Sequence, residues 1–122
     1  MKLQRIFREW LPPGVPRWSA IITIVLLAMA WAIPPWRLAP LLEAGEIIPL
    51  HYNIYFGVDY LGAWQYVFAL PAFATVVFIL NTILSKRERR ESKLVSDMLA
   101  ITHVVVSLVV VTALFFVLLI NV

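Results

Sequence analysis

The sequence lacks the residues and motifs on which most catalytic and metal sites depend. Cysteine is absent from the 122 residues, which excludes disulfide bonds, thiolate catalysis, iron–sulfur clusters and thiolate zinc sites. There is no Gly-rich phosphate loop, no H-E-x-x-H zinc helix and no Ser/His/Asp arrangement with supporting spacing. We therefore predict a protein that is not an enzyme and that holds no cofactor and no metal ion.

Charge is also scarce, and apolar residues take its place. Charged residues make up 14% of the chain and hydrophobic residues 62%, whereas about a quarter of a soluble domain is charged. The mean hydropathy is +0.89, which indicates a membrane protein. The net charge of +3 does not indicate nucleic acid binding, because the charges are grouped beside apolar runs, where membrane topology explains them.

Three apolar runs are long enough to cross a bilayer, since one crossing takes about 20 helical residues. We predict an all-α membrane protein in one membrane domain, with three transmembrane helices, an N-terminal interfacial amphipathic helix and an extended outward-facing loop. The predicted segments are an interfacial segment 1–15, helices 16–34, 62–84 and 98–122, an outward loop 35–61 and a cytoplasmic loop 85–97.

The basic residues predict the orientation. Two basic clusters flank the predicted helices on one side: Lys2, Arg5, Arg8 and Arg17, then Lys86, Arg87, Arg89, Arg90 and Lys93. The outward loop holds only Arg37 against Glu43, Glu46 and Asp59. By the positive-inside rule we expect a multi-pass protein of the plasma (inner) membrane, with its N-terminus cytoplasmic and its C-terminus outside.

A cleavable signal peptide is the alternative interpretation of the first helix. The tripeptides 28–30 and 30–32 are formally A-x-A sites that follow an apolar run. The long basic region ahead of the run and Trp31 within the second site favour an uncleaved anchor.

The first eleven residues show helical amphipathicity. Apolar side chains recur at i, i+3, i+4, i+7 and i+8, with the cations on the other face: Leu3, Ile6, Phe7, Trp10 and Leu11. We expect a short helix on the inner leaflet that ends before Pro12. Its role is either a plain interfacial anchor, which we favour, or a contact with anionic lipid or a partner.

Few polar residues fall within the predicted helices. Pro71 predicts a kink in the second one. In the third, His103 and Ser107 form an i, i+4 pair, and an intramembrane histidine is a candidate for proton relay or metal ligation. We favour a structural role, because no acidic residue or second histidine lies at matching depth; His51 is expected on the opposite side of the membrane.

The outward loop changes its pattern at Ile47. From there apolar and polar residues alternate with a period of two, which predicts a half-buried strand that needs a partner strand or other hydrogen-bonding groups. Gly57 is predicted to permit a turn, and Asp59 to cap the helix that starts at Gly62.

This loop resembles a known family motif, carried by seven residues directly before a membrane helix: Pro49, His51, Tyr52, Asn53, Gly57, Asp59 and Gly62. It is similar to a small bacterial membrane domain of unknown function that also occurs in the SdpI-like immunity proteins for the sporulation-delaying-protein toxin. The resemblance covers roughly residues 45 to 84. It implies a helical inner-membrane protein with an outward loop and a role in toxin immunity or another envelope function.

Two interpretations of the loop remain open. In one, His51, Asn53 and Asp59 bind an extracellular ligand, with Glu43 and Glu46 as further candidates. In the other, which we favour, His51 and Asn53 bond to backbone groups and lock the loop over the bundle. The expected partner is the lipid bilayer, with a membrane protein or a second copy as further candidates. The alternative function is an accessory transmembrane subunit of a larger complex.

Overall fold

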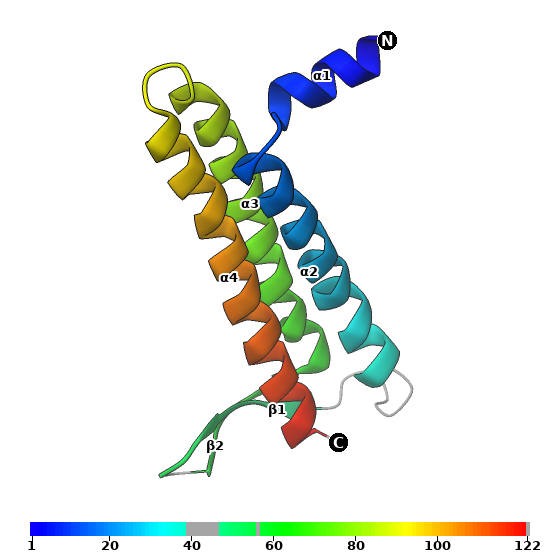
Figure 1. Ribbon diagram of the computed structural model, residues 1–122. Helices are drawn as coiled ribbons and strands as arrows, with labels where there is room; N and C mark the ends of the chain where they lie inside the picture. The colour runs from blue at the N-terminus through cyan, green and yellow to red at the C-terminus, as the bar shows by residue number, and fades with distance from the viewer. Residues whose placement is uncertain (39–46, 56, 122) are drawn as a thin grey trace.

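A computed structural model describes residues 1–38, 47–55 and 57–121. It contains a bundle of three long helices with a short helix at one end and a two-stranded sheet at the other (Figure 1). In chain order the elements are α1 (Lys2–Trp10), α2 (Val15–Leu38), β1 (Ile47–Asn53), β2 (Gly57–Ala63), the 3-10 helix η1 (Trp64–Phe68), α3 (Ala69–Glu88) and α4 (Lys93–Ile120).

Three helical segments are long and apolar enough to cross a membrane. Among the described residues these are Val15–Leu38, Gln65–Glu88 and Lys93–Ile120, of 24, 24 and 28 residues. The most apolar 18-residue stretch of each has a mean hydropathy of 1.8, 2.2 and 2.9, respectively. The prediction of a mostly helical, multi-pass membrane protein with three spans is therefore confirmed. The small antiparallel sheet is an addition that the all-α description does not include.

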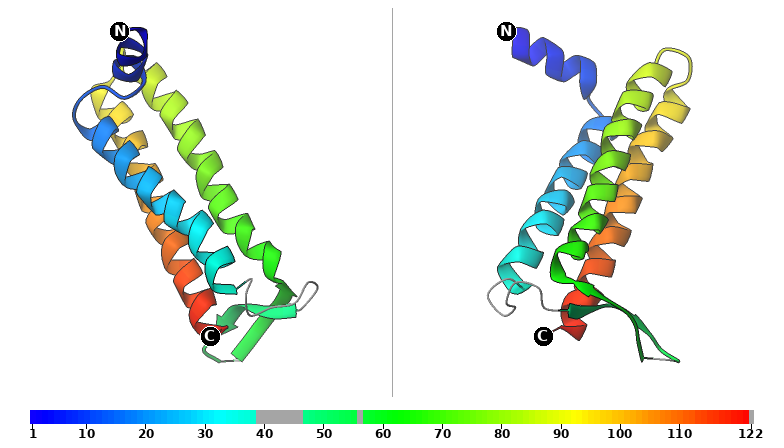
Figure 2. Two further views of the ribbon diagram at one scale, coloured as in Figure 1. Left: turned by 90° about the vertical axis from the view of Figure 1, so that its right-hand side faces the viewer. Right: turned by 180° about the vertical axis from the view of Figure 1, so that it is seen from behind.

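Helix α4 is the central element of the bundle. It packs against both α2 and α3, which contact each other much less (Figure 2). The buried residues of α4 alternate at spacings of four and three: Ser96, Ala100, His103, Ser107, Val110, Leu114 and Val117. Such a heptad-like seam is typical of helices that cross at a small left-handed angle, as in most transmembrane bundles.

Small residues are also frequent among the buried residues of α2 and α3. In α2 the buried set includes Ser19, Ala20 and Ala30, and in α3 it includes Ala74 and Ser85. Lipid supplies no hydrophobic driving force between helices, so close backbone approach at small residues and interhelical hydrogen bonds must hold the bundle together.

One such contact joins α3 and α4. The Ser85 hydroxyl donates to the Ser96 carbonyl at 2.9 Å, and the Ser96 hydroxyl donates to the Ser85 carbonyl at 2.8 Å. Both side chains are buried, and their two hydroxyl oxygens lie 2.8 Å apart. This reciprocal pair fixes the register of the two helices close to the turn that connects them.

The first long helix extends past its predicted end at residue 34. α2 continues through Pro34 and Pro35 to Leu38, although each proline removes one backbone donor. Pro34 and Leu38 are both buried. Their packing in the bundle offsets the two missing hydrogen bonds and keeps the last turn helical.

The second long helix starts later than the predicted Gly62. Residues 57–63 form strand β2, η1 follows, and α3 begins only at Ala69. Asp59 therefore lies in a strand, and the predicted helix cap at Asp59 is wrong. Phe68 occupies the N-cap position of α3. Pro71 falls in the first turn of α3, where no intrahelical donor is needed, so its ring requires no kink.

The third helix starts earlier than the predicted residue 98, and the connection 85–97 is correspondingly shorter. α3 runs to Glu88 and α4 starts at Lys93, so only four residues connect them. Ser92 is the reason: its hydroxyl oxygen accepts from the Val95 backbone N–H at 3.3 Å and caps α4. Lys86 and Arg87 lie in the last turn of α3, where cations are favourable.

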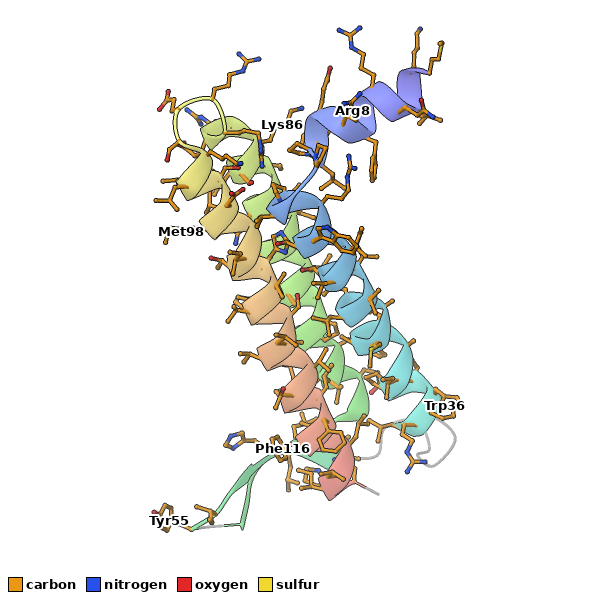
Figure 3. All side chains as sticks on the ribbon, in the orientation of Figure 1. Arg8, Trp36, Tyr55, Lys86, Met98 and Phe116 are labelled. Carbon is orange, nitrogen blue, oxygen red and sulfur yellow. The ribbon has the colours of Figure 1, made fainter. Side chains whose placement is uncertain are left out.

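The two ends of the bundle differ in chemistry. α1 and the α3–α4 turn lie at one end, which we call the α1 end, and the β1–β2 hairpin lies at the other, the hairpin end (Figure 1). Arg8 and Lys86 lie at the α1 end, and Tyr55 at the far tip of the hairpin (Figure 3). Both predicted cytoplasmic basic clusters thus occupy the same end of the molecule.

Candidate functional site

The hairpin at residues 47–63 carries the sequence motif, and its two strands pair antiparallel. Asn53 pairs with Gly57, Pro49 with Leu61 and Ile47 with Ala63. Gly57 has a φ of 76°, a left-handed conformation that favours glycine, and it opens β2 directly after the turn. The partner that the predicted strand required is thus the next seven-residue segment.

The pairing has two irregularities. The register shifts between Pro49 and His51 and again between His51 and Tyr52, so that Leu50 and Asp59 have no paired residue opposite them. Such bulges bend a strand and redirect its side chains. Gly62 lies close to this point, where an added Cβ would stand 2.7 Å from Leu50 Cδ1. The absence of a side chain at residue 62 therefore leaves room for the side chains of Leu50 and Tyr66, whose Cδ2 would stand 2.9 Å from the same Cβ.

The hairpin is fastened to the bundle by packing and by one polar contact. Ile48 is buried in the same apolar cluster as Leu114 and Val117 of α4, and Leu50 packs against that cluster. The Asn121 side chain donates from Nδ2 to the Pro49 carbonyl at 2.6 Å and to the Val117 carbonyl at 2.8 Å. The C-terminal end of α4 therefore holds β1 across the end of the bundle.

An open cavity of about 420 Å³ lies where the hairpin meets α3 and α4. The described residues that line it are mostly apolar, and His51 is the one titratable side chain among them: Leu50, His51, Leu70, Ala113, Phe116, Val117 and Ile120. A second hollow of about 300 Å³ shares Leu50, Leu70 and Val117 with it. Phe116 lies close to the hairpin in Figure 3. The chemistry available here is apolar contact with one imidazole beside it.

The predicted site residues are only partly brought together. Pro49 and His51 lie on β1, Asn53 ends that strand, and Gly57 and Asp59 lie on β2. The side chain of His51 is exposed at the cavity. The side chains of Asn53 and Asp59 and the whole of Glu43 and Glu46 lie outside the described residues. Among the described residues no group of three His, Asp or Glu side chains gathers as a metal site would require.

The intramembrane pair presents a different arrangement. His103 is 2% exposed, and its Nδ1 lies 2.7 Å from Oγ1 of Thr23, which is fully buried. The ring of Phe78 meets the imidazole edge-on, with the centroids 5.0 Å apart. Thr23 of α2 and Phe78 of α3 therefore both contact His103 of α4, so that all three long helices meet at this histidine. The arrangement joins the helices and leaves the imidazole no access to bulk water.

Thr23 was not singled out from the sequence. It is one of two hydroxyl residues in the first predicted helix, and that scarcity was the available signal. Ser107, one turn beyond His103, is buried, and its hydroxyl has no hydrogen-bond partner among the described residues. The predicted i, i+4 pair thus shares a buried face, but only its histidine is bonded across helices.

Comparisons with protein-family models, with curated proteins and with solved structures find no match for this chain.

Proposed function

We propose that this chain is a non-enzymatic, multi-pass protein of the bacterial plasma membrane, related to the SdpI-like domain. Its hairpin end faces outward and gives it an envelope function of the toxin-immunity type. In this proposal the cavity between the hairpin, α3 and α4 receives an apolar segment of a membrane-active peptide. The N-terminus and both basic clusters lie in the cytoplasm, and the C-terminus lies outside.

The observation that carries the proposal is the cavity itself. It is about 420 Å³ in volume, apolar, and formed on one side by the strand that holds the motif residues Pro49 and His51. Small-molecule and peptide sites are typically apolar hollows with a few polar groups that fix orientation. Here Leu50 and Phe116 would supply contact area and His51 the polar group.

A killing assay tests this function. Cells that express the protein are expected to survive the sporulation-delaying-protein toxin better than cells with an empty vector. Phe116→Ala should lose that protection, because truncating a central aromatic side chain typically weakens binding by about 2 kcal/mol, or about thirtyfold. Phe73→Ala is the matched control: Phe73 is 59% exposed and Phe116 60%, but Phe73 does not line the cavity. Equal protection by both variants would remove the cavity from the proposal, and no protection by the wild type would remove toxin immunity.

The orientation has its own test, which the absence of cysteine makes simple. Tyr55→Cys places a thiol at the exposed hairpin tip, and Arg90→Cys places one in the α3–α4 turn. An impermeant maleimide added to intact cells should label residue 55 and should reach residue 90 only after the membrane is opened. The reverse pattern would invert the topology.

An accessory subunit of a larger membrane complex is the second candidate. One observation favours it, namely the small buried share of the α3 span. In the most apolar 18-residue stretch of Gln65–Glu88 only 17% of the residues are buried, against 33% in the span of α2 and 28% in that of α4. The open face of α3 could pack on a partner helix as well as on lipid. Purification in mild detergent distinguishes the two. Stoichiometric co-purification of larger subunits would favour the complex, and a small homogeneous species would oppose it.

A further inference from the structure

A second candidate site lies at the opposite end of the molecule, where α1 joins α2. A shallow recess of about 630 Å³, which we call the α1 recess, is lined by Leu3, Gln4, Phe7, Arg8, Pro13 and Arg17. The four α1 residues lie at i, i+1, i+4 and i+5, along the side of the helix where its apolar face meets its polar face. Among the described residues that line it there are two guanidinium groups, one amide and no acidic side chain. Its composition therefore favours an anion that also has apolar parts.

Two cationic side chains, Lys86 and Arg17, hold α1 in position over this recess. The Lys86 ammonium lies 3.6 Å from the centre of the Trp10 ring, which ties the end of α1 to α3. Arg17 donates from Nε and Nη2 to the Leu11 carbonyl at 3.3 and 3.1 Å, and its guanidinium lies 5.4 Å from the centre of the Phe7 ring. The corner between α1 and α2 is thus preorganised before any ligand binds.

Both arginines keep donors for a ligand. A guanidinium has five N–H donors, and the bonds from Arg17 to Leu11 leave its Nη1 group unused among the described contacts. Arg8 has no hydrogen bond or ion pair to any described residue, and it lies at the α1 end in Figure 3. By contrast, Arg5 lies 3.5 Å from Glu9 in an exposed ion pair and does not line the recess.

An apolar track continues from the recess along α2. Ile21, Ile24 and Ala28 follow Arg17 at i+4, i+7 and i+11, which places them on the same side of the helix, and all three are exposed. α2 is long and apolar enough to span a membrane, so this stripe runs down from the recess into the region of the acyl chains. A cationic corner above an exposed apolar stripe matches a phosphate group with two acyl chains below it.

We propose that the α1 recess binds one anionic phospholipid, with its phosphate between Arg8 and Arg17 and its acyl chains along Ile21 and Ile24. Arg17, held by Leu11 and Phe7, positions the phosphate, and Arg8 closes over it from α1. Basic pockets beside transmembrane helices are typical sites for anionic headgroups. A soluble phosphate would leave the apolar stripe unused, so the lipid is the ligand that fits both features.

Native mass spectrometry of the full-length protein in a neutral maltoside detergent tests the proposal. The probes are dioleoylphosphatidylglycerol, dioleoylphosphatidylcholine and glycerol 3-phosphate. The wild type is expected to retain one phosphatidylglycerol in preference to phosphatidylcholine, and glycerol 3-phosphate should not compete at equal concentration. Arg8→Gln should weaken the affinity for phosphatidylglycerol about fivefold, the usual effect of one basic residue at an anionic surface. Arg8→Lys should restore most of it.

Arg5→Gln is the matched control, because it removes the same charge from the same helix outside the recess. Its affinity should equal that of the wild type. Equal loss in Arg5→Gln and Arg8→Gln would overturn the site in favour of diffuse surface charge. Equal retention of phosphatidylcholine, or an unchanged affinity in Arg8→Gln, would also overturn it. Competition by glycerol 3-phosphate would assign the recess to a soluble phosphate.

Discussion

The hydrogen bond between Thr23 and His103 gives the most direct test of what holds this bundle together. Thr23→Val keeps the shape of the side chain and removes its hydroxyl. His103 Nδ1, 2.7 Å from that hydroxyl and 2% exposed, is then left without its partner. A buried polar group without a partner costs about 1–3 kcal/mol, while a hydrogen bond between membrane helices is worth about 0.6 kcal/mol on average and up to about 1.7. We expect Thr23→Val to lower the free energy of unfolding by about 1–2 kcal/mol.

The assay is an SDS titration of the purified protein in mixed micelles, followed by tryptophan fluorescence. Thr112→Val is the control, since Thr112 is exposed on α4 and, among the described residues, its hydroxyl bonds only to the Leu108 carbonyl of its own helix. This variant should unfold like the wild type, within about 0.5 kcal/mol.

A double variant separates an orphaned imidazole from a lost packing contact. His103→Leu in the Thr23→Val background replaces both partners by apolar side chains of similar size, which can be close to neutral for stability. The double variant should therefore be more stable than Thr23→Val alone. If Thr23→Val matched Thr112→Val, or if the second change simply added to the first, this hydrogen bond would not stabilise the bundle.

Three further outcomes are expected. Asn121→Ala removes the donor to the Pro49 carbonyl, so amide hydrogen exchange over residues 47–53 should accelerate. The control variant Asn81→Ala in α3 should leave that exchange unchanged. Equal exchange rates in the two variants would mean that packing alone holds the hairpin. Ser85→Ala, which loses the bond to the Ser96 carbonyl, should lower the free energy of unfolding by about 1 kcal/mol. Ser85→Leu, which also forces α3 away from α4, should lower the free energy of unfolding by about 1–3 kcal/mol more than Ser85→Ala does. An equal effect of these two variants would show that α3 and α4 do not approach closely at residue 85.

The long helices could be predicted from the sequence because their signal is simple. A run of about 20 apolar residues has few other stable solutions in lipid, so the number of spans followed directly. The helix ends were less accessible, because they depend on single residues. Ser92 starts α4 five residues before the predicted position, and the burial of Pro34 and Leu38 lengthens α2 past two prolines that usually end a helix.

The candidate site was predicted in part, for a related reason. The alternation from Ile47 identified β1, but β2 is divided between the predicted outward loop, which ends at residue 61, and the predicted helix 62–84, because Gly62 and Ala63 continue into the apolar run. Only the need of β1 for a partner strand selects the extended conformation there. The Thr23 contact could not be derived at all, because residues 80 positions apart meet through the packing of two helices.

The buried seam of α4 has a polar half and an apolar half, so the α1 end and the hairpin end of the bundle can respond differently to a bound ligand. Toward the α1 end the seam holds Ser96 and His103, both hydrogen-bonded to neighbouring helices; toward the hairpin end it holds Val110, Leu114 and Val117. Hydrogen bonds are directional and fix one register, whereas contacts between aliphatic side chains tolerate small shifts. Val117 also lines the cavity beside the hairpin. A ligand in that cavity can therefore displace the end of α4 while the polar contacts keep the three helices in register.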